Sequence, residues 1–280
     1  MADLEQVLSE ALSLGDEGRW ADMADVLAEA LEQTPDDPYL LCWLGVAERE
    51  LGNEGVAYEY FRRCLEQDPL DPQLLALAGS GLAAFDDPEA EAALRTAALT
   101  GPDIPTTRLQ YGAYLARSGL FEEALEHLRA AVDLAPDDAA VHSELGVALA
   151  LKGELGPAVE AMEHALELAP DDSWTRLLLG LLYAELDSLD EAAETLSQAA
   201  EERLDDVEAQ VLAALAAAAV GWEQAAHEAL ARAEQAAVRG DGRLLLEVEE
   251  RIFAGAEAAR EMLFDELGPS ILRERLRQPL

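Results

Sequence analysis

The sequence predicts an all-α protein in which one helical hairpin is repeated along most of the chain, and three regularities carry this prediction. A glycine recurs at spacings of 33 or 34 residues, at Gly45, Gly79, Gly112, Gly146 and Gly180. An alanine recurs with the same period, at Ala57, Ala90, Ala124, Ala158 and Ala192. A proline does so too, at Pro35, Pro69, Pro102, Pro136 and Pro170. Such a shared period is the signature of proteins whose small units bury their apolar faces against their neighbours.

Seven consecutive units account for residues 4–240. We place them at 4–37, 38–71, 72–104, 105–138, 139–172, 173–206 and 207–240. The small residues of the glycine and alanine columns let the two helices of a unit approach closely, and larger side chains such as Leu44 and Phe61 fill the interface at helical spacing. Aspartates in the turns between units stand where an N-cap would begin the next helix. They are Asp37, Asp138, Asp172 and Asp206.

Two segments carry a more specific pattern. LLCWLGVAERELGNEGVAYEYFRRCLEQDP and HSELGVALALKGELGPAVEAMEHALELAP approach the motif W-x2-L-G-x2-Y…A-x3-F…P, so the chain resembles the tetratricopeptide repeat (TPR) family. The resemblance implies a right-handed superhelical solenoid whose first helices line a concave groove and whose second helices form the convex face. The terminal units depart from the pattern, as terminal repeats commonly do, with Ala11 and Ala214 in the glycine column.

Residues 241–280 fall outside the period. Their apolar residues share one face of a predicted helix, which we expect Gly268-Pro269 to break; these residues are Leu245, Val248, Ile252, Ala259 and Leu263. A short basic segment, ILRERLRQPL, follows. We expect a C-terminal helical cap on the last unit. The alternative is a tail that folds back into the groove or docks elsewhere.

Composition excludes several classes of protein. The chain carries 58 acidic and 19 basic residues, a net charge of −39, so we expect no nucleic-acid partner and no docking on anionic lipid. The stretch MADLEQVLSEALSLGDE is acidic and amphipathic, unlike a secretory signal, and no apolar run of about 18 residues occurs. We therefore expect a cytoplasmic protein with no membrane insertion. With two cysteines there is no disulfide framework.

No motif for catalysis stands out. The four histidines, at positions 127, 142, 164 and 227, lack zinc-site spacing, and phosphate loops, dinucleotide motifs and nucleophile elbows are missing. Glutamates occur on the second helix of nearly every unit, and a solvent-exposed helix face explains them. We assign no catalytic residue, no cofactor and no metal, and we expect the protein not to be an enzyme.

The groove that the resemblance implies is the predicted functional surface. Most side chains expected to point into it are apolar or small, and a soluble monomer rarely leaves such a stripe bare. The predicted partner-binding residues are Tyr39, Cys42, Val46, Leu109, Ala113, Ser143, Val147, Trp174, Leu177, Leu181, Val211 and Leu215. Trp174 is the predicted anchor. The alternative is that these side chains are ordinary core residues with no role in binding.

We therefore expect a scaffold or adaptor that holds an amphipathic helix or extended segment of another protein in the groove. Two alternatives stay open: a chaperone for a secreted or assembling client, and a self-assembling homo-oligomer in which groove and tail of neighbouring copies engage. The acidity has two explanations as well. One is a basic partner steered to the surface, and the other is adaptation to a salt-rich cytoplasm.

Overall fold

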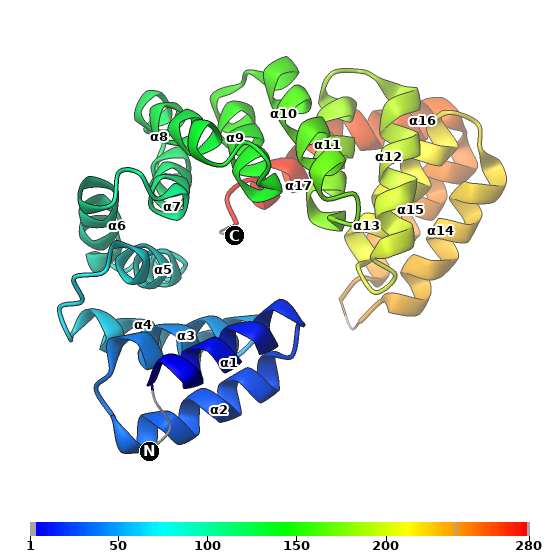
Figure 1. Cartoon of the computed structure of the whole chain (residues 1–280). Coiled ribbons are helices and arrows are strands. Elements are labelled where there is room, and N and C mark those ends of the chain that lie inside the picture. The colour runs from blue at the N-terminus through cyan, green and yellow to red at the C-terminus, as the bar shows by residue number, and fades with distance from the viewer. Residues whose placement is uncertain (1–3, 239, 279–280) are drawn as a thin grey trace. The chain divides into compact units, whose positions relative to one another are not determined.

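The computed structural model describes residues 4–238 and 240–278, and within them all regular secondary structure is helical (Figure 1). The chain divides after Ala135 into two compact bodies, an N-terminal body ending at Ala135 and a C-terminal body spanning Pro136–Gln278. Residues 241–278 pack within the C-terminal body, and the boundary at residue 240 between repeats and cap stays a prediction.

The N-terminal body consists of four helix pairs. They are α1 (Leu4–Asp16) with α2 (Trp20–Gln33), α3 (Pro38–Glu50) with α4 (Glu54–Leu65), α5 (Pro72–Ala83) with α6 (Glu89–Thr100), and α7 (Pro105–Arg117) with α8 (Phe121–Leu134). Successive pairs stack on one another, as each unit of a solenoid does.

The C-terminal body continues the pattern with three pairs. They are α9 (Ala139–Lys152) with α10 (Leu155–Leu168), α11 (Ser173–Glu185) with α12 (Leu189–Glu202), and α13 (Val207–Ala219) with α14 (Glu223–Ala236). Non-repeat elements follow: α15 (Gly242–Ala254), α16 (Ala256–Glu261), a π-helical turn η1 (Met262–Leu267) and α17 (Gly268–Arg275). The helix pairs fit the seven predicted units, and the predicted all-α solenoid class is confirmed.

The turns between units begin the next helix as predicted. Asp37 Oδ1 accepts hydrogen bonds from the backbone N–H groups of Tyr39 and Leu40, at 3.0 and 3.1 Å. Asp138, Asp172 and Asp206 cap α9, α11 and α13 in the same way. Each carboxylate satisfies N–H groups that have no partner inside the helix and lies at the positive end of its dipole.

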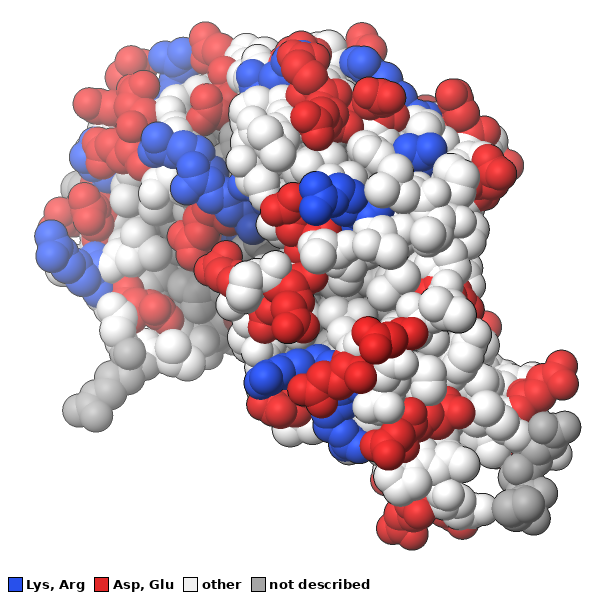
Figure 2. Space-filling model, turned by 90° about the vertical axis from the view of Figure 1, so that its left-hand side faces the viewer, with Lys and Arg blue, Asp and Glu red and all other residues white. Residues whose placement is uncertain are grey.

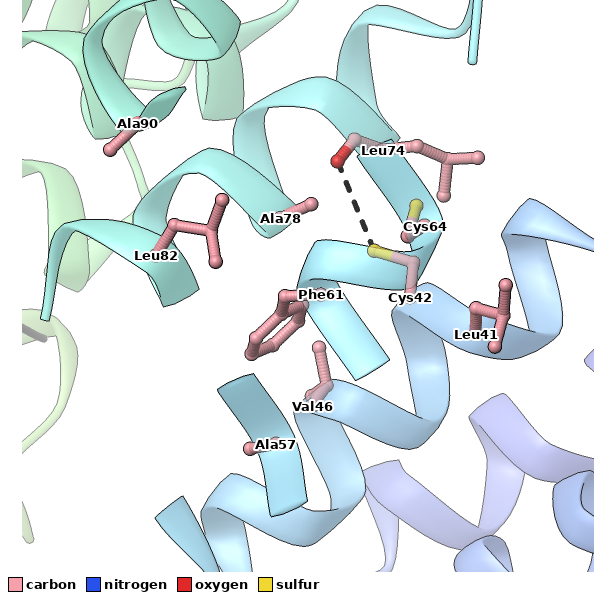
Figure 3. Close-up of a cluster of buried hydrophobic side chains, with 10 residues drawn as sticks. All are labelled: Leu41, Cys42, Val46, Ala57, Phe61, Cys64, Leu74, Ala78, Leu82 and Ala90. Carbon is pink, nitrogen blue, oxygen red and sulfur yellow. Dashed lines mark hydrogen bonds between the residues drawn. The ribbon is translucent and has the colours of Figure 1, made fainter. Parts of the chain in front are cut away.

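The core of each body lies between the helices of a pair and between neighbouring pairs. In the cluster of Figure 3, the ring of Phe61 on α4 is 1% exposed and packs among Val46, Ala57 and Leu82. The glycine column is what permits this closeness. A Cβ placed on Gly180 would lie 2.7 Å from Leu196 Cγ, so a larger residue would push α11 and α12 apart.

The C-terminal helix breaks elsewhere than predicted. Gly255 separates α15 from α16 with φ +111°, a conformation that residues with a Cβ rarely adopt. Gly268-Pro269, the predicted break, instead lies in the first turn of α17, where proline is tolerated because its missing N–H needs no partner. The predicted single helical face therefore belongs to separate elements, and the chain changes direction between Ile252 and Ala259.

Candidate protein-binding surface

The predicted groove residues of the N-terminal body are mostly buried. Cys42 is fully buried, and its Sγ lies 3.9 Å from the carbonyl oxygen of Leu74, so it points at α5 (Figure 3). Val46, Leu109 and Ala113 are between 5% and 7% exposed. Tyr39 differs: it is 36% exposed, and its hydroxyl donates to Asp71 Oδ2 at 2.9 Å.

The corresponding residues of the C-terminal body are buried as well. The set comprises Ser143, Val147, Leu177, Leu181, Val211 and Leu215, each 4% exposed or less. The hydroxyls of Ser143 and Thr175 form a hydrogen bond of 2.7 Å that joins α9 to α11. Ser143 therefore faces the neighbouring first helix, and all six side chains are shielded from solvent. That these residues bind a partner stays a prediction, and such contact would require the segments that cover them to move.

Part of that cover is the chain's own C-terminal segment, defined here as residues 256–278. Within the C-terminal body, α16 packs against α13, η1 contacts α11 and α13, and α17 packs against α11 (Figure 1). The segment buries four aliphatic side chains almost completely: Leu263, Ile271, Leu272 and Leu276. A Cβ on Gly268 would stand 3.9 Å from Leu181 Cδ2, which shows how closely α17 begins to the predicted groove residue. α15, by contrast, packs on α13 and α14.

Arg275 on α17 links the C-terminal segment to α11 and to the start of α13. Arg275 Nη2 donates to Glu208 Oε2 at 2.6 Å and approaches Asp206 Oδ2 at 3.4 Å. Its guanidinium carbon lies 5.3 Å from the centre of the Trp174 ring. We call Trp174, Asp206 and Glu208 the arginine site. The Arg275 side chain is 14% exposed, so its ion pairs are partly shielded from water and are stronger than pairs on an open surface.

Asp206 connects this site to the repeat itself. Burial opposes its ionisation, but the backbone N–H of Ala209 and the guanidinium groups of Arg203 and Arg275 outweigh burial and lower the pKa of its carboxyl. Arg203 Nη2 pairs with Asp206 Oδ2 at 2.9 Å, and its guanidinium lies 5.9 Å from the Trp174 ring. The same carboxylate therefore caps α13 and holds two arginines.

A second arginine ties the other end of the C-terminal segment. Arg260 on α16 donates to Asp187 Oδ1 at 2.6 Å, and its guanidinium lies over the ring of Phe264. Asp187 lies just beyond Leu186, the C-cap of α11, whereas Asp206 directly precedes α13. The side chains of Arg260 and Asp187 are 41% and 66% exposed, so this pair contributes less than the arginine site.

The pairing of Arg275 with this site is not predicted from the sequence, although a signal for half of the site is present there. Trp174 and Glu208 occupy the same position in consecutive units, 34 residues apart, the second residue of α11 and of α13. The period therefore places both on one face. Nothing in the period points to Arg275, which lies outside the repeats and 67 residues beyond Glu208.

The described residues contain no cluster of three or more His, Cys, Asp or Glu that could hold a metal ion. The neighbouring Cys64 thiol and burial both raise the pKa of the Cys42 thiol, which favours its protonated form. Across the described part of the chain, no helix has the length and apolar character needed to cross a bilayer.

The acidic residues form no single docking patch on the face shown in Figure 2. Acidic side chains are scattered there among basic ones. Among the described residues of the whole chain, several opposite charges are close enough to compensate one another, for example Arg19 with Asp22 at 2.8 Å and Arg62 with Glu66 at 3.6 Å. These pairs are exposed and each contributes little to stability.

Comparisons with family models agree with the repeat pattern. One model described as tetratricopeptide repeat matches residues 8–72, 88–138 and 112–173, and a second with the same description matches residues 152–219. No curated protein matches the sequence significantly.

Solved structures share the fold. The crystal structure of the APC/C hetero-tetramer Cut9–Hcn1 contains a chain that aligns with a TM-score of 0.73 and 19% identity, over 90% of this chain and 49% of that one. PilF of Pseudomonas aeruginosa aligns with a TM-score of 0.59 and 20% identity, over 76% and 95%. TTC0263, a TPR protein of Thermus thermophilus, gives 0.51 and 25%, over 62% and 95%. The chain spans about half the length of the first, and the likeness concerns the fold alone.

Proposed function

The chain belongs to the tetratricopeptide repeat family, and from that premise we propose that it is a non-enzymatic scaffold or adaptor that binds a helical or extended segment of another protein on the faces of its first helices. Repeat proteins of this kind generally act as protein-interaction modules, since their stacked units present a long surface and no reactive group.

One observation carries the proposal. The first helices α11 and α13 already accept a helical segment, residues 256–278, through buried aliphatic side chains and arginine–carboxylate pairs. A surface that takes one amphipathic helix has the apolar stripe and the polar ends that a partner helix would need. In the N-terminal body, Tyr39 and Gln73 begin first helices α3 and α5 and are exposed, so they are the accessible contact candidates.

Site-specific photo-crosslinking tests this function. A photoreactive phenylalanine analogue would replace Tyr39 or Gln73, both on first helices, and in a matched control Val56, which is 46% exposed on second helix α4. Each variant would be irradiated in native extract of the source organism, after its helicity and melting temperature have been shown to equal those of the unmodified chain.

We expect discrete adducts with one other protein from positions 39 and 73 and none from position 56. Adducts from position 56 alone would move binding to the second helices and overturn the proposal. Adducts between two copies of this chain would make self-assembly the function, and no adduct from any position would also contradict a scaffold role.

A further inference from the structure

We propose that the arginine site is a recognition site for an arginine carried on an amphipathic helix of the partner, and that α17 occupies it as a built-in, displaceable competitor. The inference rests on the proposed function and specifies both the chemistry of the partner and the control of its access. The partner helix carries the pattern that α17 presents: two adjacent aliphatic residues, an arginine four positions after the first of them, and a further aliphatic residue.

The geometry of the site matches a guanidinium group. Glu208 accepts hydrogen bonds from Nε of Arg275 at 3.2 Å and from Nη2 at 2.6 Å. The planar fork of arginine makes such paired contacts, whereas lysine offers a single point charge. The Trp174 ring offers the electron-rich face on which a guanidinium stacks. Arginine is therefore the side chain this site selects.

The face of α17 defines the rest of the pattern. Ile271 and Leu272 are each 5% exposed and Leu276 is 4% exposed, and they lie on the same side of the helix as Arg275. Arg273, by contrast, is exposed and donates to the carbonyl oxygen of Pro269 in its own helix. The arginine site therefore binds Arg275 and makes no contact of this kind with Arg273, two positions earlier.

Charge favours an external ligand of the same kind. The whole chain has a net charge of −39, whereas residues 268–278 carry three arginines and one glutamate. Without Arg275, the site would hold two carboxylates, Asp206 and Glu208, against the single guanidinium of Arg203. That uncompensated negative charge would attract another basic helix, and at long range the acidic chain would steer it.

The hold on α17 is of a kind that a competitor can break. Glu208 is 41% exposed at its side chain, so water and a competing guanidinium can reach it. α17 follows a π-helical turn. Such turns are rare in proteins as a whole, but many of those that occur lie at functional sites. Its contacts involve one helical face of eight residues, so its exchange need not unfold the repeats.

The test uses the full chain and a labelled peptide with the sequence of residues 268–278, GPSILRERLRQ. Arg275→Ala removes the internal competitor's arginine and leaves the site intact, and Arg273→Ala is the matched control. Fluorescence anisotropy measures peptide affinity, and hydrogen exchange measures the protection of amides 268–276. Circular dichroism verifies that both variants fold.

We expect the peptide to bind Arg275→Ala about tenfold more tightly than it binds wild type or Arg273→Ala, since a ligand's apparent affinity scales with the fraction of open sites. Amides of α17 should exchange faster in Arg275→Ala alone. A peptide whose second arginine, the counterpart of Arg275, is replaced by alanine should lose this binding. Equal affinity for the two variants, unchanged exchange, or full binding by the altered peptide would each overturn the proposal.

Two outcomes separate this inference from its neighbours. If the peptide fails to bind while positions 39 and 73 still crosslink to a partner, the proposed role of the arginine site is wrong and the scaffold function is retained. If sedimentation shows a wild-type dimer that the peptide converts to monomer, the occupant is α17 of a second copy, and the assignment to another protein is wrong.

Discussion

The guanidinium of Arg275 lies 5.3 Å from the centre of the Trp174 ring, joining the last described helix to the start of a repeat helix about one hundred residues earlier. Trp174 is the anchor that the sequence predicts for a partner, and in this structure its ring is engaged by the chain itself. The face of α11 that carries the predicted anchor is thus covered by α17 of the same chain.

Truncation of the anchor should loosen the C-terminal body. We expect Trp174→Ala to lower the free energy of unfolding by about 1–3 kcal/mol, through lost aromatic packing and a lost cation–π contact. Denaturant unfolding measures it. Phe253→Ala is the control, because Phe253 is 94% exposed and its loss should change stability by less than about 0.5 kcal/mol. Equal effects of the two substitutions would contradict the packing described here.

The glycine column can be tested at one position. Gly180→Ala places a Cβ 2.7 Å from Leu196 Cγ and should destabilise the protein by about 1–3 kcal/mol through overpacking. Gly156→Ala on α10 meets nothing within 4 Å, so it should be neutral or stabilising by up to about 1 kcal/mol, as alanine is the better helix former. Melting curves of the pair decide the matter; a stable Gly180→Ala protein would refute the close helix approach.

Loss of the N-cap aspartate of α9 should destabilise the protein, whereas loss of the aspartate next to it should not. Asp138 accepts a hydrogen bond of 3.0 Å from the backbone N–H of Ala140, so Asp138→Ala should cost about 1 kcal/mol of stability. Asp137 is exposed beside it and is not the cap of α9, so Asp137→Ala should be nearly neutral. Chemical denaturation of both variants compares them directly, and a larger loss for Asp137→Ala would reverse the assignment.

Acid should weaken the docking of α17. The pKa of Asp206 is lowered in the folded chain, so its contribution to stability is present above the ordinary aspartate pKa of about 3.9 and is lost as pH falls through the lowered folded value. We expect α17 amides to lose protection as the pH falls below about 4. Asp206→Asn should flatten this dependence, whereas Asp205→Asn, at an exposed neighbour, should keep the wild-type profile.

The two explanations of the acidity differ in their salt dependence. Adaptation to a salt-rich cytoplasm predicts a melting temperature that rises from low salt to molar KCl, because counterions screen the self-repulsion of a chain with net charge −39. A flat melting temperature would remove that explanation. A basic partner instead predicts an association rate that falls with added salt, which stopped-flow mixing with the peptide measures.

The repeated unit and its local geometry can be predicted from the amino-acid sequence. The glycine and alanine columns, the large side chains between them and the aspartate caps are contacts within a hairpin or across one turn, so they leave a period that can be read directly. Gly180 against Leu196 and Asp172 at the start of α11 are of this kind. Short-range steric and hydrogen-bonding requirements recur with every unit, and the residues that meet them recur too.

Which side chains are exposed and which are buried depends instead on how the helices pack. The period places Cys42 and Ser143 on first helices, but whether they face a groove or the next helix depends on how far successive units rotate, and the structure directs both at a neighbouring helix. The path after Gly255 was equally hidden, because Arg275 meets Trp174 and Glu208 through contacts that occur once and leave no period. Unique long-range contacts are chosen by the packing of the whole body, and no local pattern encodes them.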